Sequence, residues 1–179
     1  MKHNPSFAGC FHPTYRLCDQ TGKKTIFSYQ KDVITTRELI KFGGGGMIDT
    51  CAIFYKKKVL KRASPWYDIM PLDQTSNLRI SLNGPIGKLD AVMSVYRINQ
   101  AQSWIGVQGK DLKKRIKFCL REIKMWRLFY KTESSKYRGT VAMAIFKIGM
   151  LYVYNIMLFI LKKSIGSKRF YKFKESIRR

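Results

Sequence analysis

Asp73, a carboxylate that can accept a proton, opens a predicted helix over residues 73–83. The dipole at a helix amino terminus helps to keep a carboxylate charged, and such a carboxylate takes a proton from a hydroxyl group within about 3 Å. Aspartate is also a common helix cap. The position itself therefore predicts a helix cap or a charged carboxylate that is available for acid–base chemistry.

A second set of residues has the chemistry to bind a sugar or a phosphate. The guanidinium fork of Arg97, beside Tyr96, suits either ligand, although a salt bridge at a strand end would use it equally well. The glycines at 43–46 permit close backbone approach to a ligand or form a plain flexible loop. Trp66 and Trp104 have rings that stack on sugar faces, and core packing is the alternative for at least one of them.

The side chains that commonly bind metals are scattered along the chain. The cysteines form no CxxC motif and no Cys/His cluster, and they are Cys10, Cys18, Cys51 and Cys119. His3 and His12 stand alone near the start, and no DxD motif occurs anywhere. We therefore predict reduced cysteines that act as small core residues, and no metal site in this chain. The first residues also lack the apolar segment of a secretory signal.

The elements that must position these residues alternate between strands and helices. Residues 6–29 predict a β-hairpin or meander around the turn DQTGKK. Thr35 and Glu38 predict the start of a helix that the glycines end at residue 42. Strands are predicted over 47–55 and 88–96, a short helix near Val59, and a loop at 65–67. This order predicts an α/β layered domain over residues 1–108.

Charge separates that domain from the rest of the chain. The 179 residues carry a formal net charge of +24. Residues 1–108 have 15 basic and 7 acidic side chains, whereas residues 109–179 have 20 basic and 4 acidic ones. The strongest apolar runs also lie in 109–179. Charge together with apolarity predicts that this region contacts an anionic membrane rather than nucleic acid.

Two helices are predicted in the basic region. Over 111–131 the apolar stripe consists of Leu112, Ile116, Cys119, Ile123, Trp126 and Tyr130, and eight basic residues fill the other faces. This predicts a basic amphipathic helix on a membrane surface, or a surface helix packed on the domain. Residues 141–161 are long enough to span a bilayer. Lys147 argues against a clean span, so we predict a helix lying in the interface, or a hairpin dipping into it, rather than a transmembrane pass.

Residues 47–104 supply an ordered set of motifs rather than one diagnostic motif. The segment MIDTCAIFYK is followed by Ser64-Pro65-Trp66-Tyr67, by the helix that opens at Asp73, by Gly87-Lys88-Leu89, by Val95-Tyr96-Arg97-Ile98 and by Ser103-Trp104. This set resembles the acceptor-side half of family 2 glycosyltransferases, inverting sugar-nucleotide enzymes with a Rossmann-like fold. The resemblance covers about the first 105 residues and includes the segment NPSFAGCFH at the start.

The resemblance implies a role for each matching residue. Asp73 corresponds to the family's catalytic base, which accepts the proton of an acceptor hydroxyl as that oxygen attacks the anomeric carbon and displaces the diphosphate. The implied substrate-binding residues are Gly45, Gly46, Thr50, Trp66, Tyr96 and Arg97. Two positions depart from the family pattern, because Leu72 precedes the aspartate and Asn99 replaces a histidine that relatives often carry.

The resemblance also implies what this chain lacks. The family binds its nucleotide sugar through an amino-terminal half whose DxD motif holds Mg²⁺ or Mn²⁺, and that motif is absent here. We therefore expect a truncated or split transferase that needs a nucleotide-binding half, no cofactor in this chain, and a divalent metal in the complete enzyme. The expected activity is sugar transfer to a saccharide or lipid-linked acceptor in surface polysaccharide synthesis, at the cytoplasmic face of the membrane.

Two other functions fit the same composition. A non-catalytic membrane-surface adaptor would keep the transferase-like part as a scaffold. A basic nucleic-acid-binding protein would use the charge, yet the basic residues alternate with apolar stripes and no nucleic-acid motif is present. We expect anionic lipid, not nucleic acid, as the polyanionic partner.

Overall fold

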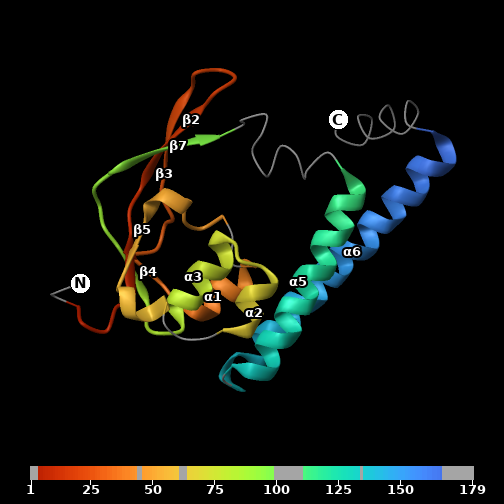
Figure 1. Cartoon of the computed structure of the whole chain (residues 1–179). Coiled ribbons are helices and arrows are strands. Elements are labelled where there is room, and N and C mark those ends of the chain that lie inside the picture. Colours follow the sequence, from red (N-terminus) through yellow and green to blue (C-terminus); the bar gives the residue numbers. More distant parts are fainter. Residues whose placement is uncertain (1–3, 44–45, 61–63, 99–110, 134, 167–179) are drawn as a thin grey trace.

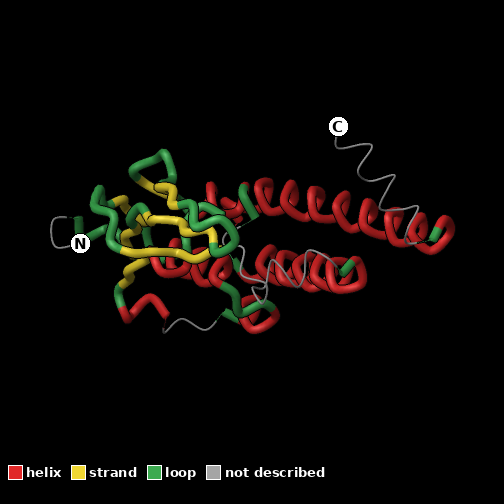
Figure 2. Tube along the Cα trace, turned by 90° about the horizontal axis from the view of Figure 1, so that it is seen from above, coloured by secondary structure: helices red, strands yellow, loops and turns green. Residues whose placement is uncertain are grey.

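The computed structural model describes residues 4–43, 46–60, 64–98, 111–133 and 135–166. The α/β prediction is confirmed: two small mixed sheets and three short helices form one part, and two long helices run side by side past it (Figures 1 and 2). The long helices are the elements predicted over 111–131 and 141–161.

The first sheet forms the strand layer of the core. Its order is β4 (Val33–Ile34), β6 (Ile86–Lys88), β1 (Gly9–Phe11) and β5 (Ile53–Tyr55). β1 runs parallel to β6 and antiparallel to β5, while β4 is antiparallel to β6. Phe11 and Ile86 are almost fully buried in this sheet. The sheet therefore brings together segments from the start and the end of the α/β part.

The second sheet is more exposed and contains three strands, β3 (Lys24–Phe27), β2 (Thr14–Cys18) and β7 (Ser94–Ile98). β2 and β3 form the hairpin predicted around the turn DQTGKK, and β7 pairs parallel to β2. Residues 88–96 are predicted as one strand, and that prediction is wrong. β6 ends at Lys88 and β7 begins at Ser94, in a different sheet.

Three short helices pack beside the first sheet (Figure 1). They are α1 (Thr36–Lys41), α2 (Pro65–Ile69) and α3 (Asp73–Ser81). α1 has the predicted capping box, in which Thr35 and Glu38 exchange hydrogen bonds. α2 lies where a loop is predicted, because Pro65 occupies the first helical turn, where its missing N–H costs nothing. The predicted short helix near Val59 is a 3-10 turn, η2 (Lys57–Leu60).

The segment 47–55 is a strand only at its end. Asp49 precedes a 3-10 turn, η1 (Thr50–Ala52), and β5 follows from Ile53. The apolar alternation of this segment predicts a continuous strand, whereas the polar contacts of Asp49, described below, bend it into a turn.

The long helices are α5 (Leu112–Thr132) and α6 (Arg138–Ile165), joined through the 3-10 turn η3 (Ser135–Tyr137). α5 packs against α2 and α6, and α6 also contacts α1. The buried face of α5 consists of Cys119, Glu122, Met125, Trp126 and Phe129. Protein covers this face, so the expectation that α5 rests its apolar face on lipid is corrected. The alternative, a surface helix packed on the domain, describes it.

α6 differs from α5 because most of its apolar surface is open. Its large exposed apolar residues are Met143, Phe146, Met150, Leu151, Val153, Tyr154, Met157 and Ile160. Within the described residues it is the one helix long and apolar enough to cross a membrane, judged by length and composition. Only 17% of its most apolar stretch is buried, whereas a core helix of a soluble protein is mostly buried.

Candidate active site

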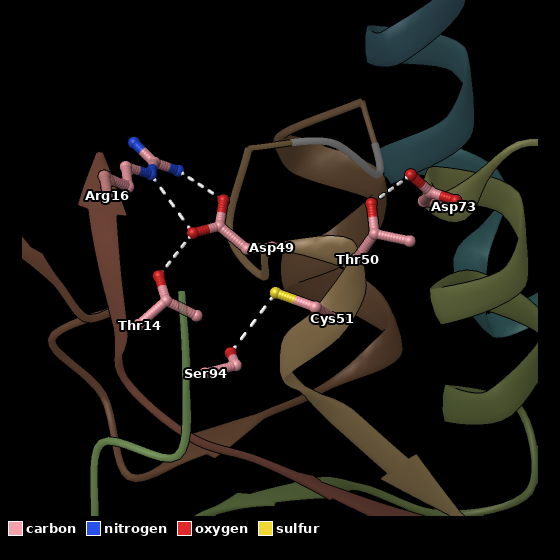
Figure 3. A network of polar contacts seen from close by, with 7 residues as sticks. All are labelled: Thr14, Arg16, Asp49, Thr50, Cys51, Asp73 and Ser94. Atoms are coloured by element: carbon pink, nitrogen blue, oxygen red, sulfur yellow. Dashed lines mark hydrogen bonds and ion pairs between the residues drawn. The ribbon is translucent and has the colours of Figure 1, made fainter. Parts of the chain in front are cut away.

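A buried ion pair fixes the segment that carries the candidate site (Figure 3). The Asp49 carboxylate accepts hydrogen bonds from Arg16 Nε at 3.1 Å and Nη2 at 2.7 Å, and from Thr14 Oγ1. Its side chain is 5% exposed. The bidentate contact satisfies a carboxylate that would be costly to bury alone, while Arg16 itself stays 27% exposed. Asp49 therefore ties η1 firmly to strand β2.

Sequence reasoning missed this ion pair. The available signal was a single carboxylate, Asp49, in the apolar run 47–54. A charge in such a run requires a partner, but the partner here lies on a distant strand. Arg16 also places its guanidinium 3.3 Å from the centroid of the Phe27 ring, so this side chain is held on two sides.

Thr50 and Asp73 meet directly. Thr50 is the first residue of η1, and its hydroxyl donates a hydrogen bond to Oδ2 of Asp73, the first residue of α3. Both residues are exposed, so solvent or a ligand has access to them. Figure 3 shows the pair beside the Asp49 network. Two of the predicted site residues, 23 positions apart in the sequence, are thus in contact.

Asp73 does not cap the helix that it opens. The residue before the helix is Leu72, whose backbone N–H donates to Thr75 Oγ1 at 3.0 Å, and that hydroxyl in turn donates to Leu72 O. The Thr75 hydroxyl thus links the first turn of α3 to the residue before it, and Asp73 takes no part in this contact. Among the described residues, the partner of the Asp73 carboxylate is Thr50, and Oδ1 has none. The carboxylate is left available for other chemistry while the helix dipole favours its charge.

The glycine tract follows α1 and leads into this site. Gly43 and Gly46 have φ of +69° and +80°, conformations that L side chains rarely adopt. Gly46 is exposed, as a ligand-facing glycine must be. Gly45 lies outside the described residues.

Tyr96 and Arg97 are placed on opposite sides of the second sheet, because side chains alternate along a strand. Tyr96 pairs in register with Arg16, and Ser94 with Thr14, so these four side chains share the face toward Asp49. Consistently, Ser94 Oγ lies 3.2 Å from Cys51 Sγ of η1. Arg97 projects from the other face and is exposed. Of this predicted pair, the structure brings only Tyr96 to the site face.

Trp66 belongs to the core. It is fully buried, its Nε1 donates to Glu133 Oε1 at 2.9 Å, and its ring packs edge-on against Phe129 at 5.1 Å. Neither ring face is open to a sugar, so the predicted substrate-binding role is corrected to a structural one that joins α2 to α5. Trp104 lies outside the described residues.

Glu122 is a second carboxylate that sequence reasoning missed. It lies on the buried face of α5, and Oε1 lies 3.8 Å from where a Cβ of Gly43 would be. Burial raises the pKa of Glu122 to about 7. The Trp126 indole N–H is near enough to lower that pKa somewhat, but it has no partner in good hydrogen-bond geometry, so burial dominates. The same burial, with Glu122 nearby, raises the pKa of the Cys119 thiol.

The side chains that commonly bind metals stay scattered in the described part of the chain. No group of three or more His, Cys, Asp or Glu side chains there could hold a metal ion. None of the four cysteines forms a disulfide; Cys10 and Cys119 are buried, as predicted for core residues, whereas Cys51 is exposed.

Comparisons of this chain with protein-family models, with curated proteins and with solved structures found no match. The function of this chain is therefore inferred from the geometry of the site and from the sequence resemblance.

Proposed function

We propose that this chain supplies the acceptor side of an inverting glycosyltransferase, with Asp73 as the general base. The observation that carries the proposal is the contact between Thr50 and Asp73 at an exposed helix terminus. The resemblance assigns both residues to the substrate region, and they lie together although the sequence separates them. The Asp73 carboxylate also takes no part in the contact between Thr75 and Leu72 at the amino end of α3.

The proposed reaction requires from this chain a charged carboxylate held at the right distance from the acceptor hydroxyl. An acceptor hydroxyl within about 3 Å of Asp73 Oδ1 would give up its proton to the carboxylate while its oxygen attacks the anomeric carbon. The bond from that carbon to the diphosphate breaks, and the diphosphate leaves with its electron pair. Thr50 acts as a positioning residue that orients the carboxylate, and the Asp49–Arg16 pair keeps Thr50 in place.

Nucleotide binding is assigned elsewhere in this proposal. Because the sequence has no DxD motif and the described residues hold no metal-binding group, the divalent metal and the nucleotide would be held by a separate nucleotide-binding half. Tyr96 on the site face and Gly46 in the glycine tract are the described candidates for contact with the sugar. In this proposal the exposed apolar face of α6 makes the membrane contact. The site would then work at the cytoplasmic surface, near lipid-linked or growing polysaccharide acceptors.

The test is sugar transfer from UDP- and GDP-sugars with Mn²⁺, with a nucleotide-binding half supplied as a second chain. Asp73→Asn should lower kcat by 10²-fold or more, since general-base contributions are about 10²–10⁴-fold. Thr50→Val should lower kcat about tenfold, and Asp68→Asn, at an exposed aspartate of α2, should change it less than twofold. Full activity of Asp73→Asn would reject the base assignment.

A non-catalytic membrane-surface adaptor is the second candidate, and the open apolar face of α6 is the observation that favours it. If the chain is an adaptor, its function is membrane binding alone. Variants at Asp73 would then bind vesicles as tightly as the wild-type chain does.

A further inference from the structure

A cavity of about 260 Å³ lies where α1 meets the first turns of α6. Its lining combines two lysines, a threonine and small or apolar residues, namely Lys41, Gly139, Thr140, Met143, Ala144 and Lys147. It is separate from the Thr50–Asp73 pair, whose residues do not line it. The proposed transfer reaction makes no use of it.

The lysines give the cavity its charge. Lys41 is in the last turn of α1 and Lys147 is in the third turn of α6, so the fold brings together two cations from distant parts of the sequence. Both are exposed, and within the described residues neither forms an ion pair. Two ammonium groups and the Thr140 hydroxyl in one concave site suit a phosphate group, which offers several acceptor oxygens and negative charge.

The other wall of the cavity is apolar, and this apolar surface continues beyond the cavity along α6. Met143 lines the cavity and is also 56% exposed. From there the apolar surface continues along α6 through Met150, Tyr154 and Met157, at the i+7, i+11 and i+14 positions of one helix face. A free phosphate has no use for this surface, whereas a phospholipid carries apolar chains attached to its phosphate.

We propose that this cavity binds the phosphate of an anionic phospholipid, whose acyl chains lie along the exposed face of α6. The site would set the depth of the helix pair, with the phosphate at the junction of the α/β part and the apolar face in the hydrocarbon below it. Lys147 lies at the edge of the exposed apolar face of α6. Its ammonium group would contact the lipid phosphate, which avoids the cost of a charge at the bilayer centre. This inference rests on the membrane placement in the proposed function, but not on the role of Asp73.

Lysine acetylation of the full chain, read by mass spectrometry, tests the site directly. The probe is dihexanoyl phosphatidylglycerol below its micelle concentration, and inorganic phosphate is the comparison ligand. We expect the lipid to slow acetylation of Lys41 and Lys147 at least fivefold, with Lys117 and Lys124 of α5 changed less than twofold. Equal protection by inorganic phosphate, or uniform protection of all four lysines, would overturn the proposal.

A matched pair of double variants separates this site from general charge attraction. Lys41→Gln with Lys147→Gln should weaken lipid binding, measured by calorimetry, at least tenfold. Lys117→Gln with Lys124→Gln removes the same charge from exposed positions on α5 and should weaken it less than threefold. Equal losses would reject the site. A dimer in light scattering, together with lysine acetylation that lipid does not slow, would also reject the site. A second copy of the chain would then cover α6. Asp73→Asn should lose sugar transfer but keep the lipid protection of Lys41 and Lys147 from acetylation. That result would support the lipid site independently of the base assignment.

Discussion

α5 and α6 lie side by side, yet they divide charge and burial in opposite ways. α5 is strongly basic but buries large side chains, including Trp126 and Phe129, between its neighbours. α6 is strongly apolar but buries only Val141, Ala144, Ile148 and Asn155. α5, the more charged helix, is therefore the one whose large side chains pack against the rest of the protein.

The difference shows that composition alone does not tell which helix meets lipid. A charged helix with one covered apolar face needs nothing further, because its lysines and arginines face water. The exposed apolar face of α6 is contiguous, and large apolar patches of this kind mark contact with another protein or a membrane. The predictions below test whether this contrast holds.

The largest effect is expected from the open face of α6. Met150→Glu with Met157→Glu should reduce binding to vesicles of mixed neutral and anionic phospholipid at least thousandfold in 0.5 M NaCl. Each change removes exposed apolar area that the bilayer would bury, worth about 1.5–3 kcal/mol, and places a charge in the membrane interface. Cosedimentation measures it, and circular dichroism checks that the fold is kept.

The control for this prediction is Leu120→Glu, which changes an apolar residue of α5 that is 47% exposed. If α5 contacts only water there, binding should change less than threefold. Equal losses from both helices would contradict the contrast between them.

The next effect concerns the covered face of α5. Trp126→Ala should lower the free energy of unfolding by about 3–5 kcal/mol, since Trp126 is fully buried and packs edge-on against Phe129 at 5.5 Å. Tyr130→Ala, at a residue that is 39% exposed, should cost less than about 1 kcal/mol. Urea denaturation measures both, and similar costs would mean that the covered face is wrongly placed.

The Trp126 and Tyr130 pair also shows how far the sequence goes. The predicted stripe includes both residues and identifies the helix correctly, because the 3.6-residue period is a local property. The buried face is rotated toward Glu122, Met125 and Phe129, since α5 contacts α2 as well as α6. The packing partners of a helix depend on the tertiary fold, and the apolar stripe does not predict them.

The α/β part follows the same rule. The Thr35–Glu38 capping box and the β2–β3 hairpin depend on adjacent residues, and both are confirmed. The division of 88–96 between two sheets depends on partners more than seventy residues away, namely β1 for β6 and β2 for β7. No pattern within the segment encodes that choice.

The candidate site was predictable only in part. Asp73 and Thr50 were selected from the sequence, and they are in contact. Trp66 was assigned to the site but lies in the core, because an aromatic residue after a proline gives no sign of its burial. Asp49 and Arg16, which hold the site in place, were missed because their pairing joins β2 to η1 across the fold.

A pH effect is expected from Glu122, the charged group on the covered face of α5. Its pKa of about 7, against an ordinary value of 4.5, means that the folded protein binds the proton more tightly than the unfolded chain. The contribution of Glu122 to stability is therefore greatest below pH 4.5 and falls as the pH rises through 7, by about 3 kcal/mol in total. Glu122→Gln should remove this slope and raise stability at pH 8, as measured by urea denaturation between pH 4 and pH 8.

Glu133→Gln is the comparison for this slope, because Glu133 accepts a hydrogen bond from Trp66 Nε1 and is not on the buried face of α5. The wild-type slope should survive in that variant. Persistence of the slope in Glu122→Gln would assign the titration to another group.

The smallest effect is expected from Asn155, the polar residue on the covered face of α6. It is fully buried, its Nδ2 lies 3.7 Å from Cys119 Sγ, and its Oδ1 has no hydrogen-bond partner among the described residues. Replacing a poorly satisfied amide by an apolar group of similar size is close to neutral, because an existing desolvation cost is removed together with one weak contact. Asn155→Leu should therefore change the free energy of unfolding by less than about 1 kcal/mol in either direction, by urea denaturation. A loss above 3 kcal/mol would mean that a buried water or a further residue satisfies Oδ1, and that α6 depends on polar contacts with α5 as well as on apolar ones.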